Sequence, residues 1–228
     1  MATQAIISYD DTQGDHDALA LGSVLADAGI ELLLAYVRHT TQTERRREEI
    51  EEHEAEALLE RGAQWLGDPD VARRVVVSGS TPEGLKWLAE QEEAEIVVFG
   101  SDYRTPPGRV APQHSAQALL EGGTAAVAIA PAGYAQLEPR IRAIGLLAAP
   151  GDDAALETAS ELADRFNATL TRGERRVDLL VVGSRPEAPA GTVMISAQSE
   201  RAIEDALSPV LVVPRGVPVV LAEPAALA

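Results

Sequence analysis

Cysteine is absent from this chain of 228 residues, and aromatic residues make up only 4% of it. The lack of cysteine excludes disulfides, thiolate chemistry and zinc sites built on cysteine. Apolar runs are short as well, and none approaches the roughly 18 residues that a membrane-spanning helix needs. The start of the chain shows no basic and apolar leader pattern. We therefore expect a cytoplasmic protein without a membrane partner.

Positive charge is also scarce, because 19 Lys and Arg residues stand against 36 Asp and Glu residues. The formal net charge of −17 creates a surface that repels nucleic-acid backbones and anionic lipids. We therefore expect no nucleic-acid partner. One small anionic ligand is still compatible with this charge, since a local backbone site can outweigh a distant field.

Strand and helix patterns alternate from the start of the chain as far as Ala130. Apolar runs predict strands at 5–9, 32–37, 75–77, 95–99 and 125–130, and helical spacing predicts helices at 17–28, 41–66, 81–91 and 114–121. Gly29 is typical of a helix end, and Thr81 before Pro82 and Glu83 of a helix start. The alternation predicts an open five-stranded parallel sheet with helices on both faces.

The chain then repeats itself in shortened form. At an offset of 83, residues 95–133 match 178–216 with ten identities in 39 ungapped positions, among them Gly100 with Gly183 and Ser101 with Ser184. At an offset of 137, the first helix matches residues near 155–164. The offsets differ by 54, so the second copy lacks about 54 residues, equivalent to most of 34–93. We expect a full domain at 1–135 and a truncated one at 136–228 that depends on the first for stability.

Three segments of the first copy resemble the universal stress protein family. They are the strand ending in Asp10, followed by Asp11–Thr12, the strand and loop 97–101, and the loop and helix 108–120. Residues 125–131 and 208–214 are similar to the last strand of that family. The resemblance implies a tandem protein with the universal stress protein (adenine nucleotide α-hydrolase-like) fold. It also implies a role in stress-response regulation.

ATP-binding members of that family use a loop of the form Gly, two residues, Gly, nine residues, Gly, then Ser or Thr. Glycines let the backbone approach phosphates, and the following helix presents free N–H groups. The first strand ends in an Asp that meets adenine. The resemblance therefore places the candidate cofactor-binding residues at Asp10, Tyr36, Gly100, Ser101, Gly108, Gln113, His114 and Ser115.

The present sequence departs from this loop pattern in both copies. In the first copy, Tyr103 replaces the second Gly, and Gln113–His114 replace the Gly–Ser pair. In the second copy, the same positions hold Pro186 and Ser196–Ala197, and Leu147 stands where the first copy has Asp10. We expect no nucleotide in the second copy. ATP with Mg²⁺ stays an alternative for the first copy alone.

Other chemical sites find little support. The acids between Asp10 and Asp17 lack the Gly and Glu of a calcium loop, and they suit a turn and a helix start instead. The four histidines are dispersed, so we expect no metal site. Ser101 and Ser184 lack a nucleophile-elbow context, so no catalytic residue is predicted. The glycine-rich motifs of other nucleotide-binding families are absent.

These observations lead to three hypotheses. The first is a non-catalytic regulatory or interaction module with a degenerate nucleotide site. Under this hypothesis, strand 125–130 pairs with strand 210–213, so that the two copies form an intrachain pseudo-dimer. The apolar tail 217–221 covers or extends the edge formed by these strands. The hypothesis is compatible with a homodimer. The second is weak ATP binding, with or without slow hydrolysis, by the first copy. The third is a different small ligand beside Asp10 and Tyr36.

Overall fold

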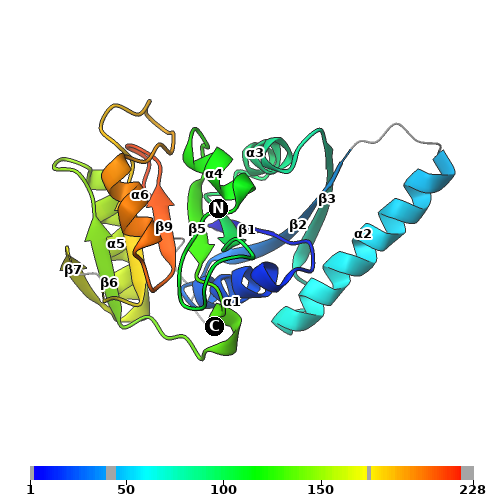
Figure 1. Ribbon diagram of the computed structural model, residues 1–228, viewed down its shortest axis with the longest axis horizontal. Coiled ribbons are helices and arrows are strands. Elements are labelled where there is room, and N and C mark those ends of the chain that lie inside the picture. The colour runs from blue at the N-terminus through cyan, green and yellow to red at the C-terminus, as the bar shows by residue number, and fades with distance from the viewer. Residues whose placement is uncertain (1–2, 40–44, 174–175, 222–228) are drawn as a thin grey trace, which may run out of the picture.

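Strands and helices alternate through both halves of the computed structural model, which describes residues 3–39, 45–173 and 176–221, with the backbone alone for 45–52 (Figure 1). The first half contains β1 (Gln4–Ser8), α1 (Gln13–Asp27), β2 (Glu31–His39), α2 (Arg45–Leu66), β3 (Ala72–Ser78), α3 (Thr81–Gln91), β4 (Ile96–Gly100), α4 (His114–Leu120) and β5 (Ala126–Ala130). The second half contains the short 3₁₀ helix η1 (Tyr134–Gln136), β6 (Ala143–Leu147), α5 (Asp153–Phe166), β7 (Thr169–Arg172), β8 (Leu179–Gly183), α6 (Ala197–Glu204) and β9 (Val210–Val213). The start of the predicted helix 41–66, at 41–44, lies outside the described residues.

One continuous sheet joins the two halves. Its nine strands run in the order β3-β2-β1-β4-β5-β9-β8-β6-β7. The five strands of the first half are parallel, as predicted, and so are the four strands of the second half. The halves meet where β5 pairs antiparallel with β9, with Ala128 opposite Leu211. The predicted pairing of these last strands is therefore confirmed.

Helices cover both faces of the sheet because strand residues alternate between two apolar clusters. Ile7 belongs to the cluster that includes residues of α1, α2 and α5, whereas Ile6 belongs to the cluster with residues of α3, α4 and α6. Residues of β5 and β9 take part in both clusters, so the core is continuous across the joint. Within the described residues, no helix combines the length and the apolar character needed to cross a bilayer.

Helix ends follow local capping chemistry. The α1 helix begins earlier than predicted because Thr12 and Asp15 form a capping box, in which each side chain accepts a bond from the backbone of the other. Gly29 follows the C-cap residue with φ of +90°, as its sequence position indicated. At α3 the cap is Ser80 rather than the predicted Thr81, since the Ser80 hydroxyl accepts from the Glu83 amide.

The second half is shortened as the two sequence offsets predicted. After β7 the chain reaches β8 without counterparts of α2, β3 and α3. The strand register corrects one detail of the sequence alignment. Ala5 pairs with Ile96, and Ile144 pairs with Leu179, the counterpart of Ile96. The counterpart of Asp10 is therefore Ala149 rather than Leu147.

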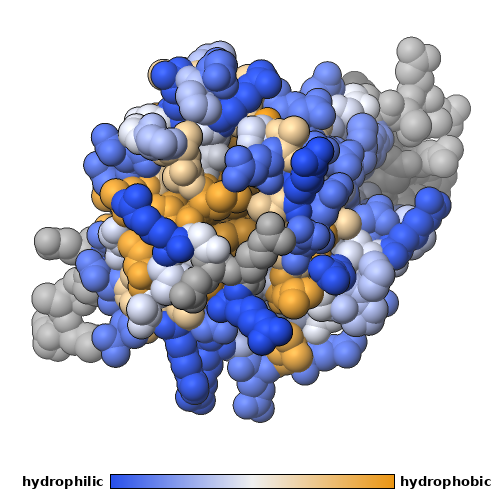
Figure 2. Space-filling view, turned by 60° about the vertical axis from the view of Figure 1, so that its left-hand side comes forward, coloured by the Kyte–Doolittle hydropathy of each residue, from blue (hydrophilic) through white to orange (hydrophobic). Residues whose placement is uncertain are grey.

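Because the second half has no counterpart of α3, part of its sheet is less covered by helices. Figure 2 turns this end of the molecule toward the viewer and shows apolar side chains (orange) at the surface. A groove of about 620 Å³ lies beside α6 and is lined in part by Leu147, Leu180 and Ala202. In the first half, Leu85 and Leu88 of α3 are buried in the cluster on that face of the sheet. The truncated copy is therefore less completely covered.

Two connecting segments tie the halves together. In the predicted linker 131–139, the backbone amides of Gly133 and Ala135 each donate to the Asp17 carboxylate at 2.8 Å. The tail 217–221 forms no strand and extends no edge, contrary to one of the expectations for it. It packs on α5 instead: the Val219 amide donates to Thr158, and Val219 is buried. The Thr3 hydroxyl, just before β1, donates to the carbonyl of Val220.

Candidate functional site

The predicted site lies where β1, β2 and β4 end, which is the edge at which open parallel sheets bind ligands. It divides into an acidic loop at residues 10–15, a hollow beside Tyr36, and the loop from Gly100 to the start of α4. Gly14 of the acidic loop lies directly against Gly100. The structure thus brings the first and third parts into contact.

The acidic loop is held by its own hydrogen bonds. The Asp15 carboxylate accepts from the Asp10 amide, the Thr12 amide and the Thr12 hydroxyl at 2.8–2.9 Å. Asp11 has φ of +57°, and its carboxylate accepts from the Tyr9 hydroxyl at 2.9 Å and from Arg61 Nε at 2.8 Å. Both Asp11 and Asp15 therefore stabilise this loop and α1 rather than pointing to a ligand.

The pKa values in this loop follow burial and pairing. Burial, and then the nearby charge of Asp15, raises the pKa of Asp10. Burial also raises the pKa of Asp15, although its hydrogen bonds oppose the shift. The hydrogen bond from Arg61 is the largest cause that lowers the pKa of Asp11. In the described part of the chain, no group of three or more His, Asp or Glu side chains is arranged to hold a metal ion.

A hollow of about 640 Å³ lies between the end of β2 and α2. Tyr36, Arg38, His39 and Arg61 are among its lining residues. His39 Nε2 lies 3.1 Å from the Thr81 hydroxyl, and Arg61 is bound to Asp11. The hollow therefore carries basic side chains next to the acidic loop.

Gly100 is closed off by the backbone of the preceding loop. A side chain at Gly100 would collide with the carbonyl group of Gly14, and one at Gly14 would lie 2.9 Å from the carbonyl oxygen of Ser101. Ser101 itself is 5% exposed, and its hydroxyl donates to the carbonyl of Ala130 at 2.7 Å and accepts from the Ala111 amide at 3.2 Å. The hydroxyl of Ser101 is thus occupied within the protein.

Most backbone N–H groups of the loop after β4 donate hydrogen bonds to protein oxygens. The backbone amides of five residues donate to oxygens of this loop or of Ala132. These residues are Asp102, Arg104, Thr105, Gly108 and Arg109. The Ala111 amide is held by Ser101, and Pro106, Pro107 and Pro112 have no amide hydrogen. A phosphate-binding loop needs N–H groups that face the ligand. Few of them are left between β4 and α4, whereas the first turn of α4 follows an N-cap residue, Gln113, that makes no side-chain cap bond.

The substituted glycine positions do not fill the site in the way the sequence suggested. The Tyr103 side chain is 78% exposed, and the Arg104 guanidinium lies 4.9 Å from its ring centre. Gln113 is the N-cap of α4 but makes no side-chain cap bond. His114 is exposed in the first turn, and Ser115 beside it is half-buried. Backbone contact with Gly14, which no sequence pattern signalled, closes the loop instead.

The second half closes the equivalent position with a side chain. A Cβ atom on Gly183 would collide with the Asp152 carboxylate, whose Oδ2 is buried without a hydrogen-bond partner. Burial raises the pKa of Asp152. Asp152 also caps α5 through the Ala155 amide. A hollow of about 480 Å³ beside it includes Ser184 and Arg215. Sequence reasoning missed Asp152, since an acid before a helix is an ordinary cap.

Several hydrogen bonds of the loop after β4 recur in the loop after β8. The Ser184 hydroxyl donates to Val213 and accepts from Met194, as Ser101 does with Ala130 and Ala111. Gly108 and Gly191 both have φ of +75°, and their amides both bind the residue two positions after the following strand. The structure therefore reproduces the offset of 83 at the level of single hydrogen bonds.

Comparisons with solved structures identify the fold. A universal stress protein from Archaeoglobus fulgidus DSM 4304 superposes with a TM-score of 0.68 and 14% identity, covering 93% of this chain and 96% of that one. A putative universal stress protein from Pseudomonas aeruginosa UCBPP-PA14 gives 0.64 and 12% identity, covering 93% of both chains. A functionally unknown protein from Pseudomonas aeruginosa PAO1 gives 0.61 and 11%, covering 94% and 93%.

The chain therefore has the tandem universal stress protein fold over nearly its whole length. No protein-family model matches the sequence. No curated protein matches it significantly either. Because the sequence identity to each of these solved structures is low, the likeness concerns the fold alone.

Proposed function

We propose that the chain is a tandem universal stress protein that acts in the cytoplasm as a non-catalytic regulatory or interaction module. Its nucleotide site is degenerate in both halves. The observation that carries this proposal is the loop after β4, in which six amides are bound by protein acceptors and three prolines have none to offer. A loop in this state has few N–H groups left for phosphate oxygens.

Two further contacts support the proposal. In the first half, the Gly14 backbone lies directly against Gly100, so that even a Cβ atom at Gly100 would collide with it. In the second half, the Asp152 carboxylate occupies the space above Gly183. A carboxylate there repels a phosphate at neutral pH, so the two halves discourage nucleotide by different means. Both contacts count against ATP with Mg²⁺ at these two positions.

The way the sheet is assembled bears on partners. Because β5 and β9 pair within one chain, neither strand presents an open edge to a second molecule. The strands at the ends of the sheet are β3 and β7. A homodimer of this protein would therefore use a different surface from the joint of the two halves.

A second candidate function is weak ATP binding by the first half. It is favoured by the hollow of about 640 Å³ beside Tyr36. Arg38, His39 and Arg61 line this hollow, and basic side chains can offset the charge of a phosphate. This alternative needs Gly14 to move away from Gly100 before the triphosphate reaches the loop.

Thermal unfolding with and without Mg-ATP separates the two candidates. The proposed function predicts no change in midpoint at millimolar Mg-ATP and no phosphate release above the buffer rate. Weak binding predicts a stabilisation of about 2.7 kcal/mol when ATP is at about 100 times its Kd. If Tyr36→Ala abolishes this stabilisation and the exposed control Tyr103→Ala retains it, weak ATP binding replaces the non-catalytic module as the favoured function.

A further inference from the structure

A pocket lies at the joint of the two copies, away from the hollow beside Tyr36. It has a volume of about 380 Å³ and is enclosed between α4 of the first half and α6 of the second. Four pairs of its lining residues are related by the sequence offset of 83, and these are Pro112 with Ile195, Gln117 with Glu200, Leu120 with Ile203, and Glu121 with Glu204. The duplication itself therefore builds this pocket.

The walls and rim of the pocket differ in character. Leu120 is 2% exposed and Ile203 is 1% exposed. Met194 adds a flexible thioether beside them. The carboxylate-bearing residues of the lining are exposed, namely Glu121, Glu200 and Glu204. The pocket thus has an apolar interior and a rim of negative charge. Its volume lies at the small end of the range for ligand pockets, roughly 300–1,000 Å³.

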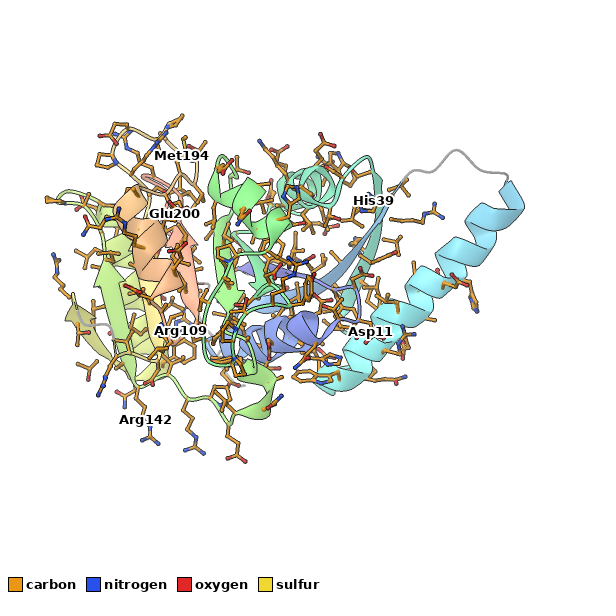
Figure 3. The ribbon with its side chains drawn as sticks, viewed as in Figure 1. Asp11, His39, Arg109, Arg142, Met194 and Glu200 are labelled. Atoms are coloured by element: carbon orange, nitrogen blue, oxygen red, sulfur yellow. The ribbon has the colours of Figure 1, made fainter. Side chains whose placement is uncertain are left out.

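Two lining residues break the symmetry of the pocket. Arg185 and Met194 of the second half line it, whereas their counterparts Asp102 and Ala111 do not. Figure 3 shows Glu200 on α6 and Met194 above that helix. The asymmetry places one guanidinium, from Arg185, in a pocket that is otherwise acidic and apolar.

The guanidinium of Arg185 is short of partners. Its Nε is buried without a hydrogen bond, and its Nη2 lies 3.6 Å from the sulfur of Met194, which is a weak acceptor. The ion pairs among the described residues include no carboxylate bound to it. An unpaired guanidinium is costly, and a carboxylate at its terminal nitrogens compensates its charge best.

We propose that this pocket binds a small zwitterion with an apolar side chain, of the class of free leucine or methionine. The ligand carboxylate accepts from Arg185, and its ammonium group faces Glu200 and Glu204 on the rim. Its side chain packs on Leu120 and Ile203, at the joint of the two copies. The site is separate from the hollow beside Tyr36, so this proposal does not depend on whether nucleotide binds.

Calorimetric titration of the full chain tests the ligand class. L-leucine and L-methionine are the probes, and two leucine fragments are the controls: 3-methylbutylamine lacks the carboxylate, and 4-methylpentanoate lacks the ammonium group. The proposal predicts saturable binding of leucine or methionine and at least roughly tenfold weaker binding of both fragments. No binding of either amino acid at about 10 mM, or equal binding of the amine fragment, would overturn it.

Substitutions locate the binding. Arg185→Gln is expected to weaken leucine binding by roughly tenfold or more, because it removes a charge-assisted hydrogen bond. Asp102→Asn, at the counterpart position outside the pocket, is the matched control and should leave affinity unchanged. Arg185→Lys keeps the charge and should retain part of the affinity, which gives a second reading if Arg185→Gln folds poorly. Equal affinity in all three variants would show that the ligand lies elsewhere.

Discussion

The two halves of this protein close the same junction in different ways. In the first half, the first turn of α1 lays its backbone at Gly14 against Gly100. In the second half, the loop after β6 lays the Asp152 side chain against Gly183. The hydrogen-bonded loop that follows each glycine is nevertheless the same in both halves. This contrast indicates that the post-strand loop is the unit kept by duplication, whereas the loop facing it changed freely.

The greatest loss of stability should come from adding one methyl group at that junction. Gly100→Ala is expected to destabilise the protein by about 3 kcal/mol or more, because the backbone of Gly14 cannot retreat without moving the start of α1. Gly183→Ala should cost only about 1 kcal/mol, since the Asp152 carboxylate can rotate away and lose no more than its cap bond. Urea unfolding of the two variants measures the difference. Equal losses would contradict the distinction between a backbone and a side-chain closure.

A smaller loss of stability is expected from replacing the two serines whose hydrogen bonds are the same in both halves. Ser101→Ala and Ser184→Ala each leave a strand-end carbonyl and a loop amide unpaired in the interior. Each variant should lose about 2 kcal/mol of unfolding free energy, and the two losses should be similar. Denaturant midpoints at constant slope provide the measurement. If Ser184→Ala were neutral while Ser101→Ala were costly, the repeated bonds would not be energetically equivalent.

The weakest change concerns the buried carboxylate oxygen of Asp152. Burial raises the pKa of Asp152 in the folded state, so its ionised form is penalised there, and stability is lost as the pH rises through that folded pKa. Asp152→Asn removes the penalty and should stabilise the protein at pH 7 by less than about 1 kcal/mol. The gain should vanish in acid, below the pKa of an unfolded Asp. Asp153→Asn, at an exposed neighbour, is the control, and a gain independent of pH would refute the assignment.

Much of the architecture could be predicted from the sequence, because apolar periodicity and internal repetition report directly on strands and helices. The offsets located the missing segment, and the pairing of 125–130 with 210–213 is confirmed. The predicted N-cap of α3 was wrong by one residue, because Ser80 and Thr81 are both favourable N-cap residues and the sequence does not distinguish them. The alignment of Leu147 with Asp10 was wrong by two residues because loop lengths leave no pattern.

The candidate site was harder to predict because it depends on contacts between distant segments. Nothing in the sequence around Gly14 indicates that its carbonyl faces Gly100. Tyr103 replaces the second glycine of the family's loop pattern, yet its side chain lies in solvent. Arg185 could not be predicted as a binding residue, because a single arginine in a loop forms no recognisable motif. Its place in a pocket becomes evident only in the folded structure, where α4 and α6 lie side by side. The roles of the predicted cofactor-binding residues stay predictions.

We infer that the truncated half is held by the first half through the β5–β9 joint and does not fold as an independent unit. Native-state hydrogen exchange can test this dependence. We expect slowly exchanging amides of β8 and β9, such as those of Val181 and Leu211, to exchange with the same free energy as those of β1 and β4, through global unfolding alone. Exchange of β8 and β9 at a distinctly lower free energy, with β1 and β4 still protected, would show two separate units and contradict the claim.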